Sequence, residues 1–227
     1  MMSARTFKLF IALMVSVVTA GYAQPQASKE TKADKLTLQG IYISADAFGY
    51  IFPIFVKDKY YSTEVSAIAN IGNRFFPAIE VGMGHTNIVS HLYDIGYSTK
   101  APYYRIGMDY NMQYKNGRPN YIYLGGRIGY TAFEYSVDAP PLKDPIWGDE
   151  AAVQFTNVPC QVLWVEAIGG VRAEIVKNIY MGWSLRYKYP LHKSATNNGG
   201  PWYIPGFGAS SKAEFGATYT VTYYFKL

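Results

Sequence analysis

Charge, cysteine and long apolar segments are all scarce in this chain. Charged residues make up 16% of its 227 residues, against about a quarter in a typical soluble domain. Cys160 is the only cysteine, which excludes an internal disulfide framework. Beyond the N-terminus, no apolar run approaches the ~20 residues that a membrane-spanning helix needs. A charge-rich soluble domain and a helical membrane protein are therefore both disfavoured.

Aromatic and hydrophobic residues are abundant instead. Hydrophobic residues reach 49% of the chain, and 17% of it is aromatic, including 22 Tyr. This content is far above that of disordered chains. The 21 Gly and 12 Pro disfavour a helix-rich domain, because both residue types destabilise helix interiors. The composition indicates an all-β chain with an apolar, aromatic surface.

Residues 1–23 have the organisation of a secretory signal peptide. Arg5 and Lys8 precede an apolar stretch over residues 9–20. Gly21 and Ala23 then supply the small residues that signal peptidase requires. We therefore expect cleavage before Gln24.

The rest of the chain divides into a polar leader and one large domain. Residues 24–35 are predicted to be a flexible periplasmic leader, and residues 36–227 an outer-membrane β-barrel. Cleavage removes two positive charges, so the net charge falls from +5 to +3. A small charge spread along the chain does not indicate nucleic-acid binding.

The domain consists of runs in which apolar and polar residues alternate. In residues 213–226, the odd-numbered positions are apolar or aromatic, and the even-numbered ones are mostly Gly, Thr and charged residues. Such alternation predicts β-strands. Seven further runs show it with varying clarity: 37–48, 60–71, 77–84, 104–113, 121–133, 163–175 and 179–189. Most are longer than the five to six residues typical of soluble sheets, and 9–11 suffice to cross a bilayer at a tilt.

The connections between these runs alternate in length. Short turns are expected at 72–74, 115–119 and 177–178, and long connections at 48–59, 86–101, 135–159 and 190–211. Short periplasmic turns and long outer loops are typical of outer-membrane barrels. The sequence therefore predicts an eight-stranded antiparallel up-and-down transmembrane β-barrel. A soluble barrel is the alternative, but it would have to expose the aromatic residues to water.

Two segments near the C-terminus carry a family resemblance. With residues 183–189 (WSLRYKY), residues 202–208 (WYIPGFG) and the last strand, the chain resembles small eight-stranded outer-membrane barrels of the OmpA/OmpX kind. It is more closely similar to an uncharacterised group of such barrels from Bacteroidota. The resemblance implies an outer-membrane location in a Gram-negative cell and no particular biochemical activity.

The alternation also predicts which charged residues face the barrel interior. An eight-stranded barrel is only wide enough to be filled by its own side chains, so these charges are expected to pair in a rigid network. The alternative, a narrow path for small solutes, stays open. The predicted interior residues are Glu64, Glu80, Arg105, Asp109, Arg127, Glu166, Arg172, Glu174, Arg186, Lys188 and Glu214.

The long connections hold the candidate partner-binding residues. Trp202 and Tyr203 lie between Pro201 and Pro205, Phe207 follows two residues later, and Trp147 lies in the neighbouring connection. Exposed aromatic patches of this kind mark interaction sites. We therefore expect a non-enzymatic structural or partner-binding role, with outer-membrane lipids, lipopolysaccharide and an envelope protein as partners.

The histidines offer the main alternative, a lipid A-modifying enzyme. His85 and His91 flank the connection at 86–101, and His192 begins the last one. No catalytic set, metal site or cofactor motif is assigned, because neither a nucleophile nor a ligand pair stands at a diagnostic spacing.

Overall fold

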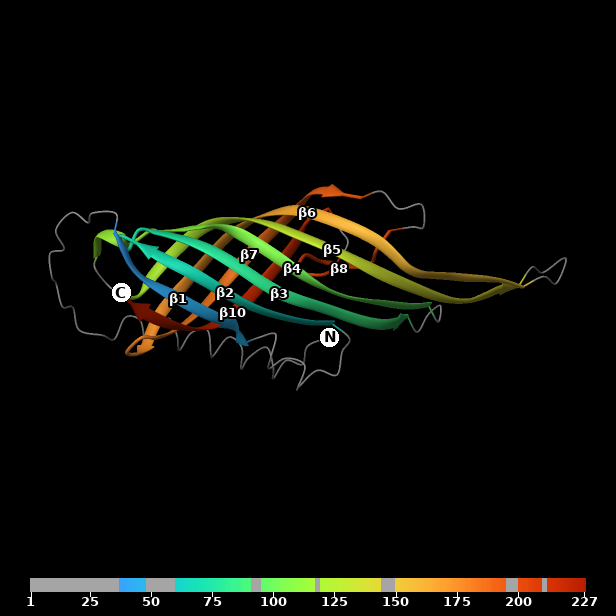
Figure 1. Ribbon diagram of the computed structural model, residues 1–227, viewed down its shortest axis with the longest axis horizontal. Helices are drawn as coiled ribbons and strands as arrows, with labels where there is room; N and C mark the ends of the chain where they lie inside the picture. Colours follow the sequence, from blue (N-terminus) through green and yellow to red (C-terminus); the bar gives the residue numbers. More distant parts are fainter. Residues whose placement is uncertain are drawn as a thin grey trace.

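Eight antiparallel strands close into a barrel in the computed structural model of the chain (Figure 1). The structure describes residues 37–47, 60–90, 95–116, 119–143, 150–194, 200–209 and 212–227. The order around the barrel is β1-β10-β7-β6-β5-β4-β3-β2. The predicted fold class is confirmed. The signal peptide and leader lie outside the described residues.

Most barrel strands are long, and each pairs with its neighbour in sequence. Their bounds are β1 Leu38–Asp46, β2 Tyr60–Ile71, β3 Phe75–Ser90, β4 Ile95–Asn111, β5 Tyr121–Lys143, β6 Glu150–Val176, β7 Ile179–Lys193 and β10 Glu214–Lys226. The first and last strands close the ring, with Gly40 opposite Lys226 and Asp46 opposite Thr220. Closure leaves no free sheet edge in the barrel wall, and free edges are not tolerated in lipid.

Short turns gather at one end of the barrel. The β2–β3 turn contains Gly72 and Asn73 with φ of 58° and 53°, and Asn178 in the β6–β7 turn has φ of 66°. Gly and Asn adopt this left-handed region more readily than other residues. The 3₁₀-helix η1 (Tyr114–Asn116) lies in the β4–β5 connection, and the C-terminus lies at the same end (Figure 1).

The connections at the opposite end contain more strand than the sequence analysis predicts. The loops expected at 86–101 and 135–159 are wrong in extent. β3 continues to Ser90 and β4 begins at Ile95, while β5 continues to Lys143 and β6 begins at Glu150. Inward-pointing residues continue into these extensions: Tyr97 and Tyr135 are both 1% exposed. The β5–β6 hairpin reaches far beyond the ring of strands (Figure 1).

The outer face of the barrel is apolar. Aliphatic side chains point away from the lumen, with Ile106 60% exposed, Ile79 57% and Leu124 53%. Contiguous apolar surface on this scale is rare on monomeric soluble proteins, and it matches the lipid-facing band of membrane barrels. No helix in the described part of the chain is long and apolar enough to cross a membrane.

Aromatic residues border this apolar face toward both ends of the barrel. Toward the extended end, Tyr104 pairs with Tyr130, and Tyr187 contacts Phe215 with ring centroids 5.0 Å apart. At the short-turn end, Phe75 and Tyr110 are paired, with centroids 5.6 Å apart. Aromatic residues concentrate at both membrane–water interfaces. The barrel therefore has the surface of a membrane-spanning protein.

The orientation can be tested with inserted epitopes. We expect an epitope in the 144–149 connection to be labelled by antibody on intact cells. An epitope at Asn116 should be labelled only after the outer membrane is permeabilised, because short turns face the periplasm. Both proteins should first be shown to fold by their gel mobility without heating. Labelling at Asn116 on intact cells would reverse the orientation.

Candidate functional site: the closed lumen and its outer mouth

A network of buried ion pairs crosses the middle of the lumen. Its members come from different strands: Glu64 from β2, Glu80 from β3, Arg105 and Asp109 from β4, Arg127 from β5, Glu166 from β6 and Arg186 from β7. All have exposed fractions of 7% or less. Strand register brings them together, since Glu80 lies opposite Arg105 and Arg127 lies opposite Glu166.

Glu80 is the centre of the network. Its carboxylate is 2.7 Å from Arg186 Nη1, 3.0 Å from Arg127 Nε and 3.3 Å from Arg105 Nη1. Arg127 also pairs with Asp109 at 2.7 Å. A charge buried in this way is costly unless it is paired.

Glu64 and Glu166 complete the pairing. Arg105 contacts Glu64 and lies 2.8 Å from Glu166 through Nε, and Arg186 lies 3.3 Å from Glu64 and 3.1 Å from Glu166. The Trp164 indole donates a hydrogen bond of 2.7 Å to Glu166. The charges therefore bridge the lumen in several directions.

Glycines on the inner face make room for these large side chains. Gly107 lies opposite Arg127, and a Cβ there would approach the Arg127 side chain to 2.7 Å. Gly129 lies opposite Trp164, where a Cβ would come within 2.2 Å of the indole. Small residues opposite bulky ones thus allow a narrow barrel to be completely filled.

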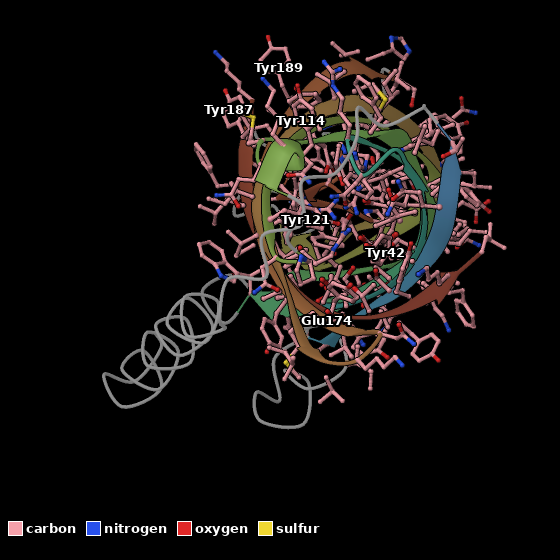
Figure 2. All side chains as sticks on the ribbon, turned by 90° about the vertical axis from the view of Figure 1, so that its left-hand side faces the viewer. Tyr42, Tyr114, Tyr121, Glu174, Tyr187 and Tyr189 are labelled. Atoms are coloured by element: carbon pink, nitrogen blue, oxygen red, sulfur yellow. The ribbon has the colours of Figure 1, made fainter. Side chains whose placement is uncertain are left out.

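Arg172 sits apart from the network, toward the short-turn end. Among the described residues it has no carboxylate partner within ion-pair distance. Instead its guanidinium lies 5.3–5.6 Å from the ring centroids of Tyr42, Tyr121 and Tyr123 and donates a hydrogen bond of 2.6 Å to the Tyr121 hydroxyl. Tyr42 and Tyr121 fill this end of the lumen (Figure 2). Cation–π contacts of this kind offset part of the burial cost.

The predicted residues Glu174 and Glu214 lie at the margins of the lumen. Both are half-buried. Glu174 accepts a hydrogen bond of 2.9 Å from the Asn178 backbone in the β6–β7 turn, and Glu214 lies opposite Lys188 in the sheet. Neither belongs to the central network.

The other end of the lumen is closed by residues 200–209, which we call the plug segment. It contains β8 (Tyr203–Ile204) and β9 (Gly208–Ala209), which pair as a small hairpin. The Gly206 carbonyl accepts hydrogen bonds from Arg105 at 2.7 Å and Lys188 at 2.9 Å. Lys188 also donates to the Phe207 carbonyl at 2.8 Å. Two interior cations thus fix the plug segment to the barrel wall.

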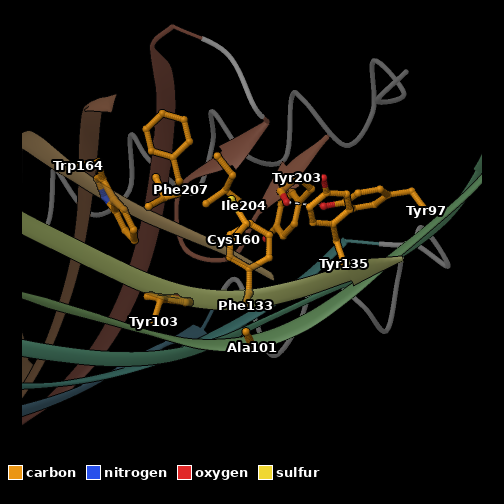
Figure 3. Close-up of a cluster of buried hydrophobic side chains, with 11 residues drawn as sticks. Tyr97, Ala101, Tyr103, Phe133, Tyr135, Cys160, Trp164, Tyr203, Ile204 and Phe207 are labelled. Carbon is orange, nitrogen blue, oxygen red and sulfur yellow. Dashed lines mark hydrogen bonds between the residues drawn. The ribbon is translucent and has the colours of Figure 1, made fainter. Parts of the chain in front are cut away.

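Apolar packing reinforces these bonds (Figure 3). Phe207 is fully buried against Trp164, and Ile204 is 1% exposed. Gly206 has φ of 78°, and a Cβ there would lie 2.4 Å from the Tyr103 ring. The backbone can therefore approach the wall this closely only at glycine.

The structure corrects the predicted partner surface. Tyr203 and Phe207 are buried, at 9% and 0% exposure, because they pack inside the mouth of the barrel, so Phe207 cannot contact a partner. Trp202 is 43% exposed and stacks on Tyr97 at 5.5 Å. Trp147 lies outside the described residues.

Tyr97 links this exposed ring to the barrel. Its hydroxyl donates a hydrogen bond of 2.8 Å to the Tyr203 carbonyl, and its ring also stacks on Tyr135. Tyr97 lies beyond the aromatic border of the membrane face, and burial raises the pKa of its hydroxyl. The phenol therefore stays protonated and keeps donating at neutral pH.

The histidines do not form a site within the described residues. His85 and His192 are exposed on the outside of β3 and β7, which are not adjacent in the barrel. His91 lies outside the described residues. The described residues contain no group of three or more His, Cys, Asp or Glu able to hold a metal ion.

This geometry defines the class of the protein: a small eight-stranded barrel of the outer-membrane type with a filled lumen. A solved structure with this fold is a major outer membrane protein from Thermus thermophilus. It has a TM-score of 0.52 and 10% sequence identity, and the match covers 82% of this chain and 98% of that chain.

Two further solved structures match with lower scores. Ail, the attachment invasion locus protein of Yersinia pestis, has a TM-score of 0.42 and 9% identity, over 83% of this chain and 99% of its own. Neisserial surface protein A has a TM-score of 0.38 and 16% identity, over 83% of this chain and 96% of its own. No curated protein matches the chain in sequence.

The chain belongs to the family described as "Domain of unknown function (DUF6048)", whose profile matches residues 6–227. The predicted resemblance to small outer-membrane barrels is confirmed at the level of the fold. The assignment to a family without a known activity is confirmed as well.

The network predicts a large effect of a single substitution. Arg127→Ala removes the ion-pair partner of Asp109 and one of the three arginines around Glu80. We expect the free energy of unfolding to fall by about 3 kcal/mol, measured by urea unfolding in vesicles. Lys177→Ala, at an exposed turn position, is the matched control. Equal unfolding midpoints for both variants would show that the network does not stabilise the barrel.

Proposed function

We propose that the protein is a non-enzymatic integral outer-membrane barrel that acts as a rigid anchor and binds an envelope partner at its outer mouth. The observation that carries this proposal is the combination of a filled lumen and an exposed Trp202. Arg105 and Lys188 fix the plug segment within the mouth of the lumen, which supports a closed lumen rather than a solute path. Among the described aromatic residues of the plug segment, Trp202 is the one that is exposed at the mouth.

The outer-membrane location follows from the surface and the closed sheet. The exposed aliphatic face requires lipid, and a closed barrel satisfies its backbone hydrogen bonds without water. Barrels of this kind are found in outer membranes. The surrounding ligands are then phospholipids and lipopolysaccharide.

Trp202 is the best-supported contact residue. It ends a row of three stacked rings, in which Tyr135 and Tyr97 are 5.8 Å apart and Tyr97 and Trp202 are 5.5 Å apart. A tryptophan held in place by stacking loses little entropy when a partner covers its free face, and tryptophan is enriched among binding hot spots. Its location at the mouth is accessible to an envelope protein.

The two alternatives have weaker support. A narrow pore would need a continuous polar path, but the lumen is filled by the ion-pair network, the tyrosines around Arg172 and the plug segment. A lipid A-modifying enzyme would need a histidine beside a nucleophile or an acid. His85 and His192 lie on the outside of well-separated strands.

Replacing Trp202 tests the partner-binding role. We expect Trp202→Ala to fold like the parent, since the side chain is half-exposed, but to lose proteins that co-purify from native membranes in mild detergent. A hot-spot tryptophan contributes about 2 kcal/mol or more, which corresponds to at least a tenfold loss of affinity. Tyr189→Ala, which removes a lipid-facing aromatic, is the control and should keep the same partners. If the same proteins co-purify with Trp202→Ala as with the parent, Trp202 is not a partner contact. If the lipid A of a His85→Ala or His192→Ala strain is altered, the result favours the lipid A-modifying enzyme.

A further inference from the structure

Arg74 lies in an aromatic cage at the short-turn end of the barrel. Its guanidinium carbon is 4.8 Å from the Tyr114 ring centroid, 5.0 Å from that of Phe75 and 5.5 Å from that of Tyr110. The backbone on both sides is fixed, because Arg74 N–H donates to Ile71 and the Arg74 carbonyl accepts from Asn111. The cage therefore presents one guanidinium in a defined place.

This guanidinium is on the membrane side of the barrel wall. Phe76 and Asn111 point inward and are fully buried, so the alternating neighbours Phe75 and Tyr110 point outward. These two rings belong to the aromatic border of the apolar face. Figure 2 shows Tyr114, the first residue of η1, at this end of the barrel and away from Tyr42 and Tyr121 in the lumen.

Within the described part of the chain, the charge in this cage has no acidic partner. Among the described residues, Arg74 takes part in no ion pair, and its buried Nε has no hydrogen-bond acceptor. Lys115 adds a second cation, with its ammonium 5.8 Å from the Tyr114 ring centroid. Two cations therefore share one tyrosine at the membrane border, where an anion would complete the pairing.

We propose that Arg74, supported by Lys115, binds the phosphate of an anionic membrane lipid in the leaflet around the short-turn end. A guanidinium matches phosphate oxygens with two parallel hydrogen bonds. Contacts with the three rings hold the guanidinium in place. In the proposed orientation, this leaflet is the periplasmic one. The inference depends on the membrane integration proposed above and is independent of the Trp202 contact.

The position of the cage favours a lipid over a free phosphate or a protein. The apolar face begins directly at Phe75 and Tyr110 and continues along β3 and β4 through Ile79 and Ile106. A lipid bound here can place its phosphate at Arg74 while its acyl chains cover these side chains. A free phosphate would make only the polar contacts.

The test is lipid binding by the purified folded protein in detergent micelles. Native mass spectrometry would count bound phosphatidylglycerol for the parent, Arg74→Gln, Arg74→Lys, Lys115→Gln and the control Lys177→Gln. Lys177→Gln removes the same charge at the same end but lies outside the cage. We expect Arg74→Gln to weaken binding of the tightest lipid at least about tenfold, Arg74→Lys and Lys115→Gln to weaken it less, and Lys177→Gln to leave it unchanged.

Three outcomes would overturn the proposal. Equal weakening of lipid binding by Arg74→Gln and Lys177→Gln would show that the lipid is held by general charge attraction and not by the cage. No weakening by either Arg74→Gln or Lys115→Gln would show that the cage binds no lipid. Displacement of the lipid by millimolar inorganic phosphate or glycerophosphate would identify a free-phosphate site. Gel mobility without heating checks that each variant is folded. If the parent protein itself did not fold as a barrel in micelles, that result would contradict the membrane barrel and not the lipid site.

Discussion

The contact of Glu80 with three arginines is the interaction on which the rest of the structure depends. Arg105, Arg127 and Arg186 come from three strands and converge on one carboxylate. The exposed aliphatic side chains of the barrel face outward, and the buried aromatic and apolar side chains inside it form two separate clusters. Paired charges occupy the lumen between these clusters, and the pairing requires strands β2 to β7 to be in register.

The same charges connect the barrel to its outer mouth. Arg105 pairs with Glu64 and Glu166 in the network and also donates to the Gly206 carbonyl, and Lys188 holds the next carbonyl. The plug segment is thereby fixed by the residues that stabilise the barrel. This arrangement exposes Trp202 while it buries Phe207, so a partner would meet a rigid surface rather than a mobile loop.

Much of this arrangement could be predicted from the sequence, because period-two alternation reports directly which face of a strand each residue occupies. It placed Glu80, Arg105 and Arg127 inside the barrel. It could not predict the extent of the hairpins or the inward course of the plug segment, since both depend on contacts between distant residues. The burial of Phe207 against Trp164 is one such contact. Gly107 and Gly129 lie opposite bulky side chains and leave room for them in the lumen. These glycines indicate a filled lumen, but the alternation of apolar and polar residues does not register them.

Closure of the lumen is tested most directly by single-channel recording. Purified folded protein without residues 1–23 would be inserted into planar lipid bilayers and its insertion verified by protease protection. The ion-pair network and the plug segment together predict no stepwise ion conductance at moderate voltage. Stable, reproducible conductance steps from the inserted parent protein would contradict a closed lumen and favour a pore.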